Sequence, residues 1–111
     1  MAMTGLLYEA AAHYKRGKEL EAAGRRREAL EAWQSALRDL HAVKPQRNRD
    51  VLLAQVYLAC HLASRDEDPA SALTSLRFGY SYARTTREPH VRILAEELWR
   101  QQQQRSSTTL E

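Results

Sequence analysis

The stretch that decides the fold is residues 24–43, GRRREALEAWQSALRDLHAV. Its large apolar residues recur at intervals of three and four, the spacing of one face of an α-helix: Leu30, Trp33, Leu37 and Leu40. Charged residues occupy the opposite face: Glu28, Glu31, Arg38 and Asp39. The pattern predicts an amphipathic helix over residues 26–43, with Trp33 as its largest core side chain.

Signals on both sides of this stretch predict further helices. An apolar stripe over residues 4–23 predicts a helix that begins after Thr4 as N-cap and ends at Gly24, because glycine readily adopts the left-handed conformation that closes a helix. After the loop 44–49, where Pro45 prevents continuation, a third helix is predicted over 51–64, capped by Asn48 or Asp50. This third segment is apolar nearly all round, which predicts a central position in the domain.

Two proline residues mark the starts of the last two helices. Asp68-Pro69 pairs an N-cap acid with proline at the first helical position, and Pro89 repeats the proline signal. Helices are therefore predicted over 69–83 and 89–103. Residues 101–111 are polar and of low complexity, so we expect a disordered tail, with a possible cloning remnant at its end.

A set of small and bulky residues recurs along the chain. Gly17, Gly24, Ala29, Trp33 and Ala36 are in part repeated 43 positions later by Cys60, Ala72, Leu76 and Gly79. This arrangement resembles a tetratricopeptide repeat (TPR) protein, although the standard repeat is 34 residues and His13 and Arg16 stand where the family favours large apolar residues. The resemblance implies an all-α fold of five helices over residues 1–100, with antiparallel hairpins stacked as a right-handed array and a capping last helix.

The resemblance also implies a binding groove, because the first helix of each pair lines the concave face in such arrays. In this chain the groove would be lined by Tyr14, Lys15, Lys18, Tyr57, Leu58 and His61. We therefore expect a non-enzymatic interaction module that binds a peptide, helix or protein partner. It would act as an adaptor or co-chaperone, and small chaperones of bacterial type III secretion have this size. The chain could also be the terminal fragment of a larger TPR protein.

Phe78 and Tyr82 form a second candidate surface. They lie four residues apart, off the main stripe of the helix predicted over 69–83. We expect them to pack beneath the last helix. If that helix moves, they become a docking patch for a partner or for a second copy of the chain.

A basic helical module that binds nucleic acid is the alternative function. The chain has 14 Arg and three Lys and a net charge of +3, with basic runs at Arg25–Arg27 and Lys44–Arg49. Binding would require both runs to reach one side of the domain. Neither run contains an aromatic residue for base stacking, and nearby carboxylates offset several of the charges, so the sequence argues against nucleic acid.

Catalytic, metal and cofactor sites are not predicted. Cys60 and His61 are adjacent and point about 100° apart on a helix, so they cannot form a nucleophile–base pair, and we expect Cys60 only to pack. The four histidines lack ligand spacing. The longest apolar stretch, residues 51–62, is too short to span a membrane. With one cysteine and no signal segment in the sequence, we expect a cytoplasmic protein.

Overall fold

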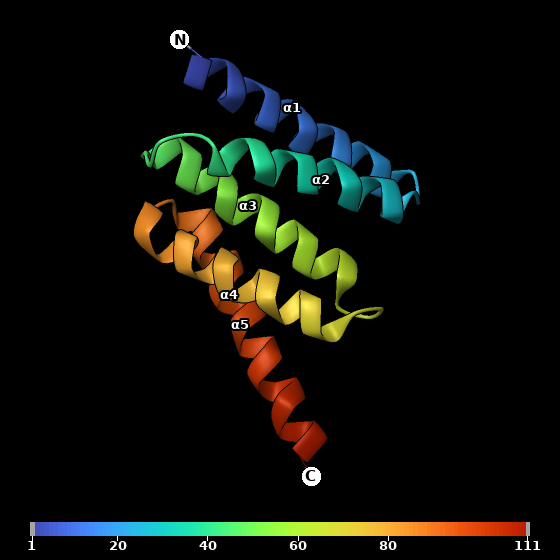
Figure 1. The fold of residues 1–111 in the computed structure, drawn as a ribbon. Helices are drawn as coiled ribbons and strands as arrows, with labels where there is room; N and C mark the ends of the chain where they lie inside the picture. Colours follow the sequence, from blue (N-terminus) through green and yellow to red (C-terminus); the bar gives the residue numbers. More distant parts are fainter. Residues whose placement is uncertain (1, 111) are drawn as a thin grey trace.

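The protein is all-α, as predicted. The computed structural model describes the backbone of residues 2–110 and the side chains of residues 5–105. Within that part of the chain there are five helices and no strand (Figure 1): α1 (Ala2–Ala22), α2 (Arg26–His41), α3 (Arg47–Ser64), α4 (Pro69–Thr86) and α5 (Pro89–Leu110).

Two helix ends follow the predicted local chemistry. Gly24 has a φ of 80°, and the amides of Gly24 and Arg25 donate to the carbonyls of Glu21 and Leu20, which closes α1 in a Schellman motif. At the start of α4, the Asp68 carboxylate accepts a hydrogen bond of 3.2 Å from the amide of Ser71, and Pro69 occupies the first helical turn.

Other boundaries differ from the prediction. The helix α1 begins at Ala2, so Thr4 is not its N-cap, and α2 ends at His41 rather than at Val43. The helix α3 begins at Arg47, with Gln46 as its N-cap in extended conformation, so neither Asn48 nor Asp50 caps it. The helix α4 continues to Thr86, because the buried Thr86 hydroxyl donates to the carbonyl of Ala83 and accepts from the amide of Glu88. The left-handed Arg87, with a φ of 60°, then ends α4.

The last helix is longer than predicted. It continues past Gln103 to Leu110, so the backbone of residues 101–110 is helical where a disordered tail was expected. Glutamine has good helix propensity and no Gly or Pro interrupts the segment. The side chains of Gln101 and Arg105 also reach the end of α3 and the turn after it.

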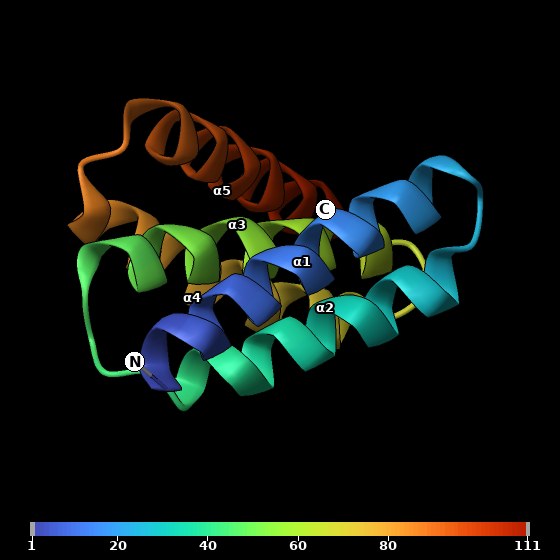
Figure 2. The same ribbon diagram turned by 90° about the horizontal axis from the view of Figure 1, so that it is seen from above.

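The helices pack as two antiparallel hairpins, α1–α2 and α3–α4, with α5 against α4. As predicted, α3 is central: it contacts all four other helices (Figure 2). Its two sides belong to different cores. One core joins Leu53, Val56 and Cys60 to α1 and α2, and the other joins Ala54 and Leu58 to α4 and α5.

Small residues let the helices of each hairpin approach closely. In the first hairpin, a Cβ atom added at Gly17 would lie 2.2 Å from Nε1 of Trp33, so the indole occupies the space of the missing side chain. In the second, a Cβ atom at Gly79 would lie 2.8 Å from Cδ2 of Leu58. The two glycines are not equivalent in the repeat, since Gly17 corresponds to Cys60 and Gly79 to Ala36.

Candidate functional site

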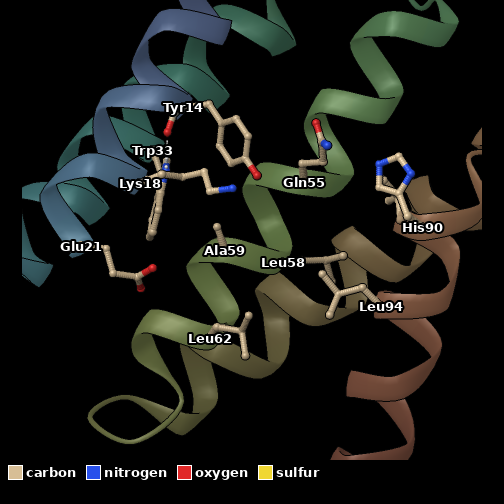
Figure 3. A pocket seen from close by; sticks show the side chains of 11 residues that line it. Tyr14, Lys18, Glu21, Trp33, Gln55, Leu58, Ala59, Leu62, His90 and Leu94 are labelled. Carbon is tan, nitrogen blue, oxygen red and sulfur yellow. Dashed lines mark hydrogen bonds between the residues drawn. The ribbon is translucent and has the colours of Figure 1, made fainter.

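An open groove lies between α1, α3 and α5. The helices α1 and α5 both contact α3 but do not contact each other, so α3 forms the floor between two walls. The groove holds a cavity of about 300 Å³ (Figure 3). Residues of four helices line it: Tyr14, Lys18, Glu21, Trp33, Gln55, Leu58, Ala59, Leu62, His90, Val91 and Leu94.

The groove is apolar inside and polar at its edge. Leu62 from α3 and Leu94 from α5 line the cavity and remain 38% and 42% exposed. The polar edge comprises Lys18 and Glu21 on one wall and His90 on the other, as Figure 3 shows. Nζ of Lys18 lies 5.4 Å from the centre of the Tyr14 ring. The groove can therefore bury apolar side chains and contact polar groups along both walls.

Three of the predicted groove residues line this cavity: Tyr14, Lys18 and Leu58. Lys15 is exposed but lies outside the lining. Tyr57 and His61 are also outside it, so the prediction that they share one surface with Tyr14 and Lys18 is wrong.

The predicted groove face of α3 is displaced by one residue from the face that lines the cavity. We predicted that positions 57, 58 and 61 face the groove, whereas the residues of α3 that line it are at positions 55, 58, 59 and 62. One residue corresponds to about 100° of rotation about the helix axis. The sequence could not fix this angle, because α3 is apolar nearly all round and its pattern singles out no solvent face.

Tyr57 instead belongs to an aromatic patch with His41, Phe78 and Tyr82. Its ring stacks on those of Phe78 and Tyr82, with centroid distances of 5.2 and 6.1 Å, and its hydroxyl lies 2.8 Å from Nε2 of His41. Burial raises the pKa of Tyr57, and Tyr82 and Cys60 add to this shift. Phe78 and Tyr82 therefore find a ring partner on α3 that the sequence did not predict. Phe78 remains 48% exposed.

His61 packs between α3 and α4, the two helices of the second hairpin. Its side chain is buried, and its Nδ1 lies 2.8 Å from the carbonyl oxygen of Ala72. Because a carbonyl only accepts, this nitrogen carries the proton and donates. Burial lowers the pKa of His61, and the positive charges of Arg65 and Arg105 lower it further. The hydrogen bond to Ala72 acts in the opposite direction and raises the pKa.

The two basic runs lie at opposite ends of α2, because Arg25–Arg27 spans its start and Lys44–Arg49 follows its end. The 16 residues of α2 separate them by about 24 Å. Acidic residues also pair with several of these arginines: Arg25 with Glu28, Arg26 with Glu67, Arg47 with Glu88 and Arg49 with Asp50. The two runs therefore do not form one basic surface.

Cys60 is buried in the first core, and burial raises the pKa of its thiol to about 12. Because the thiolate is the reactive form, we expect Cys60 in the folded protein to resist a disulfide reagent at pH 8. Unfolding with guanidinium should restore rapid reaction, with one thiol per chain measured by absorbance. Rapid labelling of the native protein would show that Cys60 is accessible and that its place in the core is wrong.

Among the residues that the structure describes, no three potential metal ligands cluster together. The helices of the same part of the chain include none that is both long and apolar enough to cross a bilayer. In comparisons with known proteins, no family model, curated protein or solved structure matches this chain. We take the groove between α1, α3 and α5 as the candidate site because it combines an apolar lining with a polar edge.

Proposed function

We propose that this chain is a non-enzymatic protein-interaction module that binds an apolar segment of a peptide, helix or protein partner in the groove between α1, α3 and α5. The observation that carries the proposal is the open apolar cavity with Leu62 and Leu94 exposed at its edge. Concave apolar sites with a few polar groups are the usual form of binding sites. Leucines left exposed there gain free energy when a partner covers them.

We also propose that the fold is a short TPR-like array. The glycine turn after α1, the small residues at both hairpin crossings and the stacking of α2 on α3 support it. In that architecture the groove lies on the concave face, formed by the first helices of successive pairs. An adaptor or co-chaperone acting in the cytoplasm, including one of a bacterial secretion system, fits a chain with this groove.

A charge placed in the groove should abolish partner binding. Leu94→Asp puts a carboxylate on the apolar wall, where a bound partner would have to desolvate it, so we expect affinity to fall roughly 30-fold or more. Ile93→Asp is the matched control, because Ile93 is the adjacent residue of α5, is 66% exposed and does not line the cavity. Both variants should retain the helical circular dichroism of the wild type.

The measurement is quantitative mass spectrometry of proteins that copurify with each tagged variant from cells of the source organism. Partners lost with Leu94→Asp but retained with Ile93→Asp would be those held by the groove. Equal recovery with both variants and the wild type would refute the groove, and the aromatic patch of His41, Tyr57, Phe78 and Tyr82 would then be the next surface to change.

A further inference from the structure

The groove over α3 continues beyond the cavity described above. A second cavity of about 350 Å³ lies between the first half of α1 and the first half of α3, and Gln55 of α3 lines both cavities. The apolar residues of the second cavity are Leu7, Tyr8, Ala11, Val51 and Leu52. The two cavities therefore form one groove along α3.

This groove follows a single face of each of two helices. The residues of α3 that line it are at positions 48, 51, 52, 55, 58, 59 and 62, and those of α1 are at positions 7, 8, 11, 14, 18 and 21. In both helices the earlier positions line the second cavity and the later ones line the first, so α1 and α3 run in the same direction along the groove. Each set covers about 21 Å of helix, the length of about four helical turns.

Exposed apolar side chains gather at both ends of the groove. Among the side chains that the structure describes, five large hydrophobic ones are exposed, and three of these line the groove: Tyr8, Leu62 and Leu94. Tyr8 is 74% exposed and lies in the second cavity, whereas the two leucines lie in the first. A single occupant that covers all three must extend along the whole groove.

The groove is suited to a helix and not to an extended segment. Its floor and walls are helices, whose backbone groups are hydrogen-bonded within each helix. Along the floor only Asn48 and Gln55 carry amide side chains that could pair with a peptide backbone. An extended segment would leave most backbone groups that face the floor without partners, which costs free energy. A helix bonds its own backbone and turns only side chains toward the floor.

The α1 wall also carries two charges of opposite sign. Lys18 and Glu21 lie three residues apart and line the first cavity (Figure 3). Neither forms an ion pair with any residue that the structure describes. At the second cavity, by contrast, Arg47 and Glu88 are paired at 3.2 Å. A complementary helix therefore has an acid opposite Lys18 and a base opposite Glu21, three or four residues apart.

We infer that the occupant of the groove is an amphipathic α-helix of a partner protein, about four turns long. Its apolar stripe covers Tyr8, Leu62 and Leu94, and an acid and a base beside that stripe face Lys18 and Glu21. This inference rests on the proposed function and specifies the partner of that same groove.

The test begins with selection on the full chain from a displayed library of random peptides of about 16 residues, enough for four helical turns. The recovered sequences should have apolar residues at helical spacing, i, i+4, i+7 and i+11, with an acid and a base three or four residues apart beside them. A synthetic peptide of recovered sequence should gain helical circular dichroism when it binds. Its affinity for each variant is then measured by fluorescence polarisation.

Tyr8→Asp and Leu94→Asp should each weaken peptide binding by about tenfold or more, because each puts a carboxylate beneath a different half of the bound helix. Ala12→Asp is the matched control for Tyr8→Asp. Ala12 lies one turn further along α1, is exposed and lines neither cavity, so binding should be unchanged.

Weaker binding with Leu94→Asp alone would overturn the helix but keep the groove as the binding site. Weaker binding with Tyr8→Asp alone, or with neither variant, would overturn both proposals. Recovery of no peptide, or of peptides that lack helical spacing or gain no helicity, would overturn the helix. So would a wild-type dimer in analytical ultracentrifugation that dissociates in Leu94→Asp, because a second copy of this chain would then occupy the groove.

Discussion

Replacing Trp33 with alanine should lower the free energy of unfolding by about 3–5 kcal/mol, most of the stability of a small domain. Trp33 is fully buried in the first core, and its Nε1 donates a hydrogen bond of 3.1 Å to the carbonyl of Tyr14. The substitution leaves a cavity between α1 and α2, because the side chains around such a site relax only partially. Urea denaturation followed by circular dichroism measures the loss.

Trp99→Ala is the comparison for this result. Trp99 is only partly buried and stacks on Tyr80 at the edge of the second core, so its loss should cost clearly less than that of Trp33. If the two substitutions cost the same, or if Trp33→Ala changes the free energy of unfolding by less than about 1 kcal/mol, α1 and α2 do not pack around Trp33 as described.

Gly17→Ala should be nearly as damaging, with a loss of about 3 kcal/mol, at the upper end of overpacking substitutions. The added Cβ would lie 2.2 to 2.7 Å from three atoms of the Trp33 indole. The indole cannot move aside without losing its hydrogen bond to Tyr14. Either the two helices separate or the ring leaves the core, and both lower the thermal midpoint.

Two further variants isolate the cause. Gly5→Ala is the matched control, because a Cβ at Gly5 meets no atom within 4 Å, so stability should be unchanged or slightly raised. In the Trp33→Ala background the clash at Gly17 is gone, and Gly17→Ala should then stabilise the protein by up to about 1 kcal/mol through helix propensity. A Gly17→Ala effect that is equal in both backgrounds would show that Gly17 and Trp33 are not in contact.

The sequence predicted those features that local chemistry determines. Gly24 had to end α1 because of its backbone freedom, and Asp68-Pro69 had to begin α4 because of its capping oxygen and fixed φ. The spacing of the apolar residues in α2 identified Trp33 as the core residue of its hairpin. In each case a few neighbouring residues decide the outcome, so no knowledge of the rest of the fold was needed.

The groove could be predicted only in part, because its shape depends on angles between helices. Tyr14 and Lys18 of the predicted set line the cavity, whereas Lys15 of the same helix does not. The side of α3 that forms the floor was misplaced by one residue, which moved Tyr57 and His61 out of the site. Leu62 and Leu94 were not predicted as groove residues, because the apolar spacing of a helix does not distinguish a leucine that lines an open groove from one that is buried in the core. The extent of α5 depended on contacts of Gln101 and Arg105 with distant segments.

The division of the interior into two cores has a mechanical consequence. The wall α1 is packed into one core and the wall α5 into the other, and α3 is the element they share. The first core itself includes Leu53, Val56 and Cys60 of α3, so the angle between the two hairpins cannot change without repacking that core. The width of the groove is therefore set by how α3 packs against its neighbours in both cores, and a partner has to fit a width that the interior of the protein determines.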